Sequence, residues 1–586
     1  MPNASLARML RASRWTFVLG LLATAVALGL YFRAGLFEFC TFDDPSYVSM
    51  NQQVLSKFTW SSVVAAFSPH QVMYWHPMTT LSFMLDGQFF HLWAGGYHLT
   101  NVLWHTANVA LFFLLVLWLT GNRFAAVFAA LLLAAHPAHV EAIAWISARK
   151  DVLSTFFGLA SILLYIRWAR KPGAALALGM YAAYALSLMA KPMFVTMAGL
   201  LLLLDYWPLG RLAALEPTGE ARLLPDARHL VACLREKVLF LALGLFSTFM
   251  TLSSHADTQD KLDPSWGLKI ANAFAAIAKY LGLLVWPSHQ AMLYPFPDAV
   301  PLVQSLGGAV LVLAVTVLCL WQARRRAYLL VGWLWFLCAL TPVIMPPKVG
   351  LHVALADRWT YVPFLGLYLA ICGLAAELLG RIERPVARAA AAIALVALPL
   401  VPLSIAQQRQ LSTWATPASV YEQDLRVTKG SYLVMSNYGV MKQSEGDLAA
   451  AERYFLEALR YSPDFAICRL NLGALRIEQG RDAEALDLLW PAMLRLEKEH
   501  QAYDSYRALA LLLTRGGKLK EAQGFYALAI REQPKRAEAY VEWGGLARRL
   551  GDLSQAREFF DKGGEAPNAF RAKVSLDSLK ALLSQP

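Results

Sequence analysis

Two adjacent carboxylates, Asp43 and Asp44, follow a membrane-length apolar run that begins at Trp15. Such a pair can do two kinds of chemistry. One carboxylate can accept a proton from an attacking hydroxyl while the other orients it, or both can hold a divalent cation such as Mg²⁺ or Mn²⁺. The alternative without chemistry is a solvated turn, which Pro45 would suit. Asp43 and Asp44 are therefore candidate catalytic residues and, alternatively, candidate metal ligands.

Other ionisable side chains lie near the ends of apolar runs, where a charge is costly and usually functional. Glu141 closes the segment H-P-A-H-V-E and is a candidate second acid or an acceptor for a sugar hydroxyl. His76, His98 and His139 are candidates to line a polar pocket. A lone histidine in such a place is also often a hydrogen-bonding packing residue, so both interpretations stay open.

The composition identifies the class of protein that must position these residues. Of 586 residues, 57% are hydrophobic and 16% are charged, and the mean hydropathy is +0.42. A soluble protein of this size does not have that balance, so we expect a polytopic membrane protein. The net charge of +12 is explained by basic cytoplasmic loops and need not indicate nucleic-acid binding. The six cysteines show no metal-binding spacing and no pairing pattern.

Apolar runs are confined to residues 1–406, and we expect about eleven membrane helices there. Residues 268–286 resemble a further span, but Lys269, Asn272 and Lys279 interrupt them with helical spacing. We therefore expect this segment to be an amphipathic helix lying on the outer face of the membrane. The expected spans lie near 15–33, 99–119, 124–144, 152–168, 174–190, 192–206, 236–253, 303–321, 328–345, 359–378 and 388–406.

Basic residues assign the sides of the membrane. Arg8, Arg11 and Arg14 precede the first run, which predicts a cytoplasmic N-terminus. An odd number of spans then places the C-terminal region outside, in the periplasm if the membrane is a bacterial inner membrane. The same count puts the long loops 34–98 and 254–302 on the outer side, together with the carboxylate pair.

The C-terminal residues 430–586 contain a repeat of about 34 residues. A glycine marks each unit, an alanine follows five residues later, and a bulky apolar or aromatic residue follows nine residues later. This is the tetratricopeptide (TPR) signature. After a linker at 411–429, we expect an α-solenoid of about four repeats, which binds peptides or proteins on its concave surface or is a packing platform without a ligand. The repeated residues are Gly446, Gly480, Gly517 and Gly551, then Ala451, Ala485, Ala522 and Ala556, then Phe455, Leu489, Tyr526 and Phe560.

Five motifs in order resemble the bacterial relatives of the transmembrane-and-TPR protein O-mannosyltransferases, which belong to the GT-C class of glycosyltransferases. The resemblance covers essentially the whole chain. It implies an all-α GT-C membrane domain over residues 1–410 with a catalytic aspartate in loop 34–98. One departure is that Lys269 and Lys279 stand where arginine is expected. The motifs are F-D-D-P-S-Y (42–47), W-H-P (75–77), H-P-A-H-V-E (136–141), R-K-D-V-L-S (149–154) and A-D-R-W-T-Y-V-P (356–363).

Such an enzyme must hold the anionic phosphate of a lipid carrier at the membrane surface. Arg149 and Lys150 are the one basic cluster that the expected topology leaves outside, and Lys191 and Arg358 enter from other turns. Arginine suits bidentate contact with phosphate. We therefore expect these four residues to bind the lipid phosphate, although Arg149 can instead pair with Asp151 or Asp357.

The resemblance implies an inverting glycosyltransferase that moves a sugar from a polyprenyl-phosphate carrier to a hydroxyl of a periplasmic protein. The TPR region would bind the acceptor. Tyr294, Asp357 and Tyr361 are candidates to line the substrate pocket, although the two tyrosines can equally be aromatic residues of the membrane interface. A divalent cation, Mg²⁺ or Mn²⁺, is the one candidate cofactor, and no nucleic acid is expected. Two alternatives remain: a glycan or lipid glycosyltransferase of envelope polysaccharide assembly, and a non-catalytic membrane scaffold.

Overall fold

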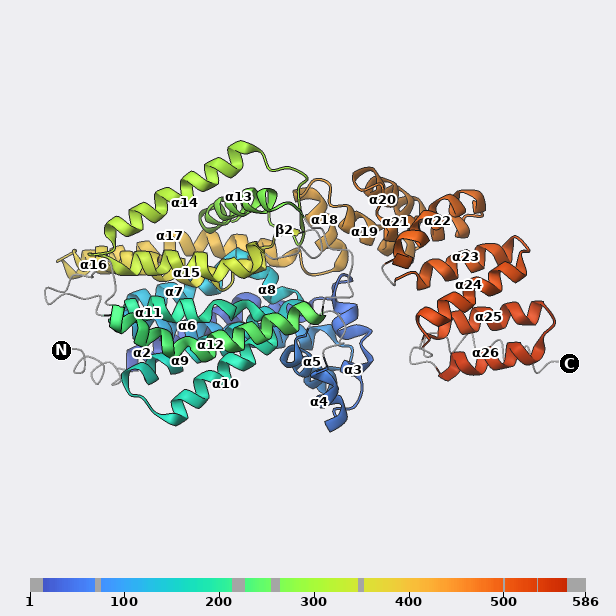
Figure 1. Cartoon of the computed structure of the whole chain (residues 1–586). Coiled ribbons are helices and arrows are strands. Elements are labelled where there is room, and N and C mark those ends of the chain that lie inside the picture. The colour runs from blue at the N-terminus through green and yellow to red at the C-terminus, as the bar shows by residue number, and fades with distance from the viewer. Residues whose placement is uncertain are drawn as a thin grey trace. The chain divides into compact units, whose positions relative to one another are not determined.

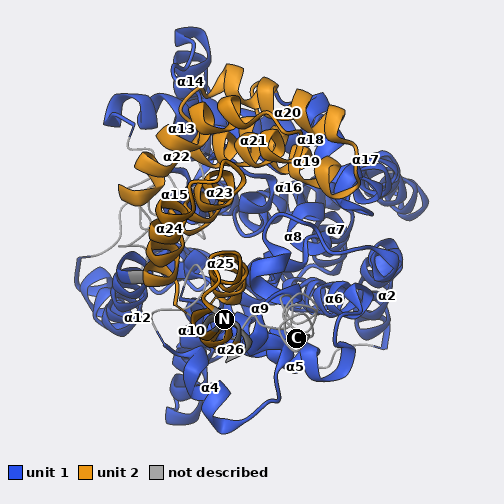
Figure 2. Ribbon diagram, turned by 90° about the vertical axis from the view of Figure 1, so that its right-hand side faces the viewer, with its two compact units in different colours: residues 1–256, 261–428 blue, residues 257–260, 429–586 orange. Residues whose placement is uncertain are grey.

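The computed structural model describes residues 14–68, 75–212, 227–254, 264–345, 353–498, 501–534 and 536–565. These residues form two compact units, one up to Thr428 and one from Lys429 onward (Figure 2). Both units are built almost entirely of helices, as the sequence predicts. Arg8 and Arg11, on which the expected orientation partly depends, lie outside the described residues.

The first unit is a bundle of long helices with shorter ones in its loops (Figure 1). Its elements are α2 (Arg14–Tyr31), η1 (Phe32–Leu36), η2 (Pro45–Ser49), α3 (Gln52–Leu55), α4 (Trp60–Ala66), α5 (Pro77–Phe90), α6 (Ala94–Thr120), α7 (Arg123–Ala135), η3 (Pro137–His139), α8 (Val140–Ala144), η4 (Ile146–Ala148), α9 (Arg149–Arg170), α10 (Ala174–Ala190), η5 (Pro192–Thr196), α11 (Met197–Tyr206), α12 (Ala227–Ser254), α13 (Trp266–Val285), β1 (Tyr294–Pro295), α14 (Leu302–Gln322), α15 (Ala327–Ile344), β2 (Val353–Leu355), η7 (Asp357–Thr360), α16 (Pro363–Gly380), α17 (Pro385–Ser412) and α18 (Pro417–Val427).

Within the described residues, eight helices are long and apolar enough to cross a membrane, fewer than the eleven expected. The difference has local causes. The expected span 124–144 bends by 57° where α7 gives way to η3 at Pro137. The expected spans 174–190 and 192–206 form apolar helical segments of fewer than 18 residues each, and the expected span 236–253, which lies within α12, is not among the qualifying helices. The qualifying helices are α2 with η1, α6, η4 with α9, α13, α14, α15, α16 and α17.

Helix α13 meets this length and composition test, although we expected it to lie on the membrane surface. Two of the three polar residues that suggested a water-facing side are turned toward the protein instead, whereas Lys279 is exposed. Lys269 and Asn272 are buried, and the Asn272 amide donates a 2.9 Å hydrogen bond to the carbonyl of Ala354. Figure 1 shows α13 beside α14 and at an angle to it. The side on which the second unit lies therefore does not follow from counting spans.

Glycines allow close approach of the long helices, as is common in membrane bundles. A Cβ on Gly332 of α15 would lie 2.4 Å from the carbonyl oxygen of Gly366 on α16. A Cβ on Gly366 would lie 2.5 Å from the carbonyl oxygen of Gly332. The two backbones therefore touch at a point where no side chain fits.

The loops that carry the candidate site are held by contacts between distant segments. Strand β1 pairs antiparallel with β2, which joins the 254–302 region to η7. The segment 411–429, expected to be a linker, is mostly the end of α17 and helix α18, packed in the first unit. The Tyr421 hydroxyl lies 2.8 Å from the Thr41 hydroxyl, and the Asp424 carboxylate accepts a 2.9 Å hydrogen bond from the amide of Leu293. These buried polar contacts are the reason that the segment is ordered against the bundle.

The second unit consists of four helical hairpins, which confirms the predicted TPR solenoid. The marker glycines Gly446, Gly480, Gly517 and Gly551 all have φ between +75° and +84° and form the turn inside each hairpin, a conformation that favours glycine. The four repeated alanines are fully buried where the paired helices meet. The hairpins are α19 (Tyr432–Ser444) with α20 (Leu448–Tyr461), α21 (Ala466–Glu478) with α22 (Asp482–Lys498), α23 (Tyr503–Arg515) with α24 (Leu519–Glu532), and α25 (Ala537–Arg549) with α26 (Leu553–Glu565).

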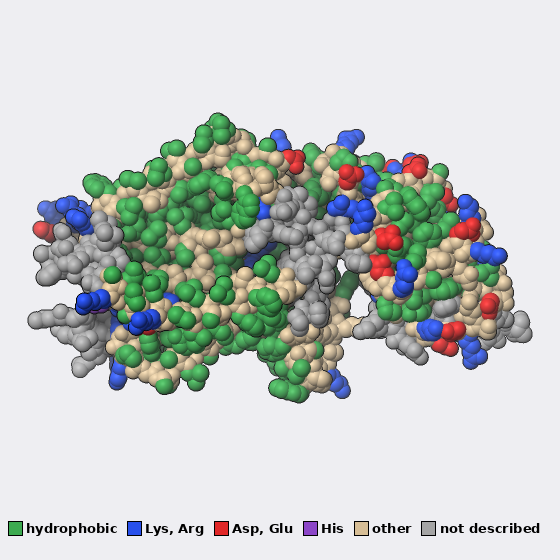
Figure 3. Space-filling view, in the orientation of Figure 1, with side chains coloured by type: hydrophobic (Ala, Val, Ile, Leu, Met, Phe, Trp, Pro, Cys, Tyr) green, Lys and Arg blue, Asp and Glu red, His purple; other side chains and the backbone are tan. Residues whose placement is uncertain are grey.

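The two units expose different kinds of side chain. Figure 3 shows that the visible face of the helix bundle is dominated by hydrophobic side chains along its length. The visible face of the solenoid carries Asp, Glu, Lys and Arg side chains among the apolar ones. The first surface suits a lipid environment and the second suits water. The chain is therefore a multi-pass membrane protein with a water-exposed TPR unit.

Candidate functional site

Asp44 anchors the first loop to the turn before α9. Its side chain is fully buried, and its carboxylate accepts hydrogen bonds from the backbone amides of Cys40 at 2.8 Å and Ser147 at 3.0 Å. The Ser147 hydroxyl donates a further, short hydrogen bond to the same carboxylate. Burial raises the pKa of Asp44 to about 6, although the bonds from Ser147 and Cys40 oppose that rise. Asp44 is therefore a positioning residue that fixes the backbone next to Asp43.

Asp43 has different surroundings from its neighbour. Its side chain keeps 8% of its surface accessible, and within the described residues its carboxylate makes no hydrogen bond or ion pair. The nearby charge is that of Arg358: burial opposes ionisation of this guanidinium, but the carboxylates of Glu141, Asp151 and Asp43 raise its pKa. Of the two adjacent acids, Asp43 is thus the one with free oxygens beside a cation.

Glu141 and Arg358 form a buried ion pair. The guanidinium of Arg358 contacts one Glu141 oxygen closely, and its backbone amide donates to the other at 2.8 Å. The guanidinium also lies 5.2 Å from the ring centroid of Trp145. Because both Glu141 oxygens are occupied, this residue orients Arg358 in this structure and is not placed as a base.

Two lysines complete the charged cluster around Asp43. The ammonium of Lys191 lies 2.6 Å from the Asp151 carboxylate, and burial lowers the pKa of Lys191 to about 8 despite that neighbour. Lys150 lies 4.6 Å from the ring centroid of Tyr47, three residues after Asp44. Lys191 and Arg358 each retain 14% side-chain exposure, so both cations are partly open to a ligand. The structure thus brings together Lys150, Lys191 and Arg358, three of the four expected phosphate ligands.

The fourth expected phosphate ligand, Arg149, has a structural role instead. Its side chain is fully enclosed and lies 2.6 Å from the carboxylate of Asp86 on α5. It also donates to the Asn101 side chain at 2.7 Å and to the carbonyl of Tyr97 at 2.8 Å. The expectation that it contacts phosphate is wrong for this structure, because its hydrogen-bond donors already join α5, α6 and α9. Nor does Arg149 pair with Asp151, which holds Lys191.

The expected pocket residues Tyr294 and Asp357 form a buried link between loops. The Asp357 carboxylate accepts hydrogen bonds from the Tyr294 hydroxyl at 3.1 Å and from the Gln290 amide at 3.2 Å. Burial raises the pKa of Asp357 to about 8, and the neighbouring carboxylate of Glu141 adds to the rise. Asp357 therefore joins η7 to the 290–294 segment and does not line an open pocket here.

The remaining pocket candidates are buried polar residues. Tyr361 receives a hydrogen bond from Asn108 at 3.2 Å and lies 2.7 Å from His105. His139 lies 2.9 Å from the Tyr368 hydroxyl, and His98 lies 3.1 Å from the carbonyl of Glu38. His76 is buried at the start of α5. In this structure these residues are buried hydrogen-bonding residues within the helix bundle. This agrees with the interpretation of the histidines as packing residues.

Sequence reasoning missed two residues on which the site depends. Asp86 is a single acid inside the largely apolar segment that becomes α5, and a charge in such a run could have identified it. Ser147 carries no such signal, because serine is common in turns and its partner Asp44 is 103 residues away.

The arrangement does not favour a metal at the carboxylate pair. Within the described residues, Asp43 and Asp44 do not meet a third metal-ligating side chain, and Asp44 is occupied by its three donors. The one described group of three such side chains is Asp205, Cys233 and Glu236. There Lys237 contacts Asp205 directly, so a cation already neutralises that group.

The fold and site define a multi-pass α-helical membrane protein with a buried acid–base cluster and a TPR solenoid. No family model matches the chain. The protein O-mannosyl-transferase TMTC2 of Mus musculus is 34% identical over 154 residues, which are 25% of this chain and 18% of that protein. The protein O-mannosyl-transferase TMTC3 of Homo sapiens is 24% identical over 531 residues, which are 83% of this chain and 57% of that protein.

These matches confirm the predicted resemblance: the chain is similar to the TMTC protein O-mannosyl-transferases. It spans less than two thirds of the length of these curated relatives. Among solved structures, Pseudomonas aeruginosa pilF is 17% identical with a TM-score of 0.25, covering 32% of this chain and 88% of that chain. A score at that level says nothing about function.

Proposed function

We propose that this chain is an inverting GT-C glycosyltransferase that moves a sugar from a polyprenyl-phosphate carrier to a serine or threonine hydroxyl of a protein. The names of its relatives support protein O-mannosylation, so mannose is the first sugar to test. The observation that carries the proposal is Asp43, a largely buried carboxylate with free oxygens beside Arg358.

In the proposed reaction Asp43 acts as general base. It accepts the proton of the acceptor hydroxyl as that oxygen attacks the anomeric carbon. The bond between the anomeric carbon and the phosphate oxygen breaks, and the polyprenyl phosphate leaves with the electron pair. Attack from the face opposite the leaving group inverts the anomeric configuration. Asp44 does not exchange protons with substrate but holds the loop in place through Ser147.

The leaving phosphate needs positive charge near the base. Arg358, Lys191 and Lys150 are the cations of the cluster that supply it. Arg358 and Lys191 are oriented by Glu141 and Asp151, so each is fixed before the substrate arrives, which lowers the cost of binding the transition state. We derive no step through a divalent cation.

We assign the acceptor-binding unit to the same side of the membrane as Asp43, which is the periplasm for a bacterial inner membrane. Contacts inside the first unit support this. Helix α18, which ends that unit, bonds through Tyr421 to Thr41, two residues before Asp43. The backbone amide of Glu38 also donates to the carbonyl of Ala415 at 3.1 Å. The chain thus leaves the first unit beside the loop that carries the base.

Purified protein in lipid nanodiscs tests the proposal with a synthetic β-linked polyprenyl-phosphate mannose and a peptide that contains serine and threonine. The account predicts a mannosylated peptide whose anomeric configuration, determined by NMR, is α. Retention of the β configuration would contradict direct attack by the hydroxyl. Transfer to a free glycan or lipid but to no peptide would favour the polysaccharide alternative. Absence of transfer from every polyprenyl-phosphate sugar would favour the scaffold.

A further inference from the structure

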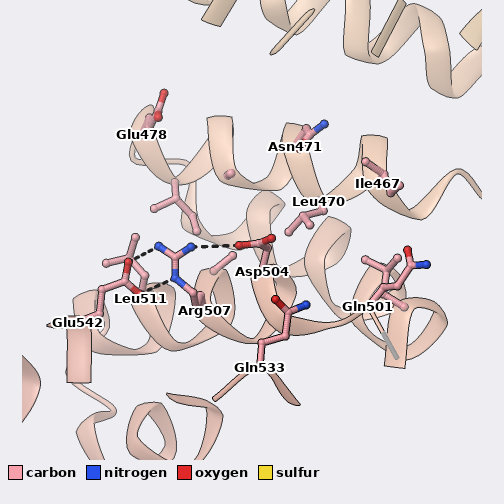
Figure 4. Close-up of a pocket in the computed structure, with 14 residues that line it drawn as sticks. Ile467, Leu470, Asn471, Glu478, Gln501, Asp504, Arg507, Leu511, Gln533 and Glu542 are labelled. Atoms are coloured by element: carbon pink, nitrogen blue, oxygen red, sulfur yellow. Dashed lines mark hydrogen bonds and ion pairs between the residues drawn. The ribbon is translucent and has the colours of Figure 1, made fainter. Parts of the chain in front are cut away.

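The solenoid contains a groove lined by the first helices of three consecutive hairpins, α21, α23 and α25, and by residues at the ends of α22 and α24. Its volume is about 590 Å³, within the range of sites that enclose a small ligand or a short peptide segment. Figure 4 shows side chains from α21 and α23 facing each other across it. The whole groove lies inside the second unit.

Aliphatic side chains along the groove are exposed without a partner. Ile467 of α21 is 39% exposed, and Leu511 of α23 is 42% exposed. Leu470 and Ala508 line the same groove and are half-buried. An apolar side chain of a ligand would gain free energy by covering this surface.

Three amide side chains line the same groove with their hydrogen-bonding capacity unused. Asn471, Gln501 and Gln533 make no side-chain hydrogen bond within the described part of the chain. Each amide offers both a donor and an acceptor. An extended peptide backbone presents N–H and C=O groups in alternation, so it can bond such amides without requiring a particular side chain.

The charges of the groove disfavour an acidic ligand. Among the described residues that line it, Arg507 is the one cation, and this guanidinium already bonds Asp504 at 3.1 Å and Glu542 at 3.1 Å (Figure 4). Arg536, outside the lining, also holds Asp504 at 3.0 Å. Glu478 is exposed and has no ion pair within the described residues. A carboxylate entering the groove would therefore meet an unpaired negative charge and no available cation.

We infer that this groove binds an extended, non-acidic peptide segment through its main chain and one apolar side chain. The inference rests on the proposed function for its biological meaning, because such a segment would be the part of the acceptor protein that the solenoid holds. It names a class of acceptor: unfolded or loop segments with apolar and neutral or basic residues. Acidic tails are excluded from this class.

Full-length protein in nanodiscs, without any sugar donor, tests the inference by fluorescence anisotropy. The probes are three fluorescein-labelled peptides of equal length, rich in Ser, Thr and Leu, that carry two Gln, two Lys or two Glu at the same positions. The Gln and Lys peptides are expected to bind. The Glu peptide is expected to bind at least about tenfold more weakly. Binding of the Glu peptide as tight as that of the others would overturn the inference.

Variants locate the binding. The double variant Asn471→Ala with Gln533→Ala should weaken binding of the Gln and Lys peptides about tenfold, because it removes two side chains that would bond the peptide main chain. Glu478→Gln should reduce the difference in affinity between the Glu and Gln peptides. Asp487→Asn removes an exposed acid on α22, outside the groove, and should change nothing. Circular dichroism confirms that each variant retains its helices. Unchanged binding in the double variant would contradict the inference.

The peptide-binding result can be distinguished from the outcome of the test of the proposed function. If peptides bind as expected but no donor supports transfer, the inference that the groove binds peptides stands and the enzyme assignment is wrong. If transfer occurs and the double variant neither weakens peptide binding nor raises the KM for the peptide, the enzyme assignment stands and the inference about the groove is wrong.

Discussion

Adjacent residues in this chain have unlike chemical roles because their side chains enter unlike surroundings. Asp44 turns into the protein and is held by three hydrogen bonds, whereas Asp43 keeps its carboxylate oxygens free. The sequence predicts the pair as a candidate site but cannot divide the roles, because the partner that distinguishes them, Ser147, is distant in the chain. The same reason hides the pairing of Glu141 with Arg358, 217 residues apart.

Replacement of Ser147 by alanine should alter the pH dependence of transfer. The hydroxyl of Ser147 lowers the pKa of Asp44 by stabilising its charged form, so its loss should raise that pKa above about 6. Protonated Asp44 loses acceptor capacity for the amides that anchor the loop. The acidic limb of the pH–rate profile should therefore move to higher pH. Ser161→Ala, which removes a hydroxyl bonded to Met180 at 2.8 Å, is the matched control. An unshifted limb would mean that Asp44 does not set it.

Asp357 should affect stability with a defined sign. Its pKa rises from 3.8 to about 8 on folding, so between these values the folded state binds one more proton than the unfolded state. The free energy of unfolding contributed by this group therefore falls as pH rises through that window. Asp357→Asn cannot ionise and should flatten the loss of thermal stability between pH 5 and pH 8. The exposed Asp298→Asn should follow the wild type. If the thermal stability of Asp357→Asn fell with pH as steeply as that of the wild type, the raised pKa of Asp357 would be refuted.

At the scale of elements, buried charges and glycines determine how the helices assemble. The repeats of the solenoid were predictable because each hairpin turn requires a glycine at positive φ and each helix pair a small residue. The spans were less predictable. The break at Lys191 was expected, because the sequence separates 174–190 from 192–206, but a hydropathy run does not reveal a bend such as that at Pro137. Lys269 and Asn272 on the polar side of α13 were expected to face water and are buried, because periodicity shows that a face is polar but not what it faces.

Arg149 should behave as a structural cation that joins α5, α6 and α9. Arg149→Met leaves the buried Asp86 without its partner and should cost about 3–5 kcal/mol of unfolding free energy. Adding Asp86→Asn should recover part of that loss, as a double-mutant cycle in denaturant would measure. If Arg149→Met instead retained full stability and only raised the KM for the lipid donor, the residue would be a phosphate ligand after all.

The contact between α15 and α16 should not tolerate a side chain. A methyl group at Gly366 would overlap the carbonyl oxygen of Gly332, so Gly366→Ala should cost about 1–3 kcal/mol through displaced helices. Gly380→Ala, at the end of the same helix with nothing within 4 Å of the added Cβ, should be neutral or slightly stabilising. Thermal unfolding in nanodiscs separates the two. Equal melting temperatures would show that the helices can move apart freely.

At the scale of the whole molecule, the chain combines a unit suited to lipid with a unit suited to water. Composition predicted this division, because apolar runs end near residue 406 and the glycine-marked repeats begin after residue 430. The boundary itself was not predictable: α18 reads as a polar linker but packs in the first unit through Tyr421 and Asp424. That packing brings the end of the membrane unit to the loop that carries Asp43.

The central claim is that Asp43 is the base of a glycosyl transfer and Asp44 its anchor. The most direct test compares the rates of mannose transfer from polyprenyl phosphate to a serine-containing peptide for the wild type, Asp43→Asn and Asp44→Asn in nanodiscs. Loss of the base should lower the rate about 10²–10⁴-fold in Asp43→Asn while peptide binding is unchanged. Asp44→Asn should retain measurable activity and lose thermal stability. Wild-type rates in Asp43→Asn would contradict the account.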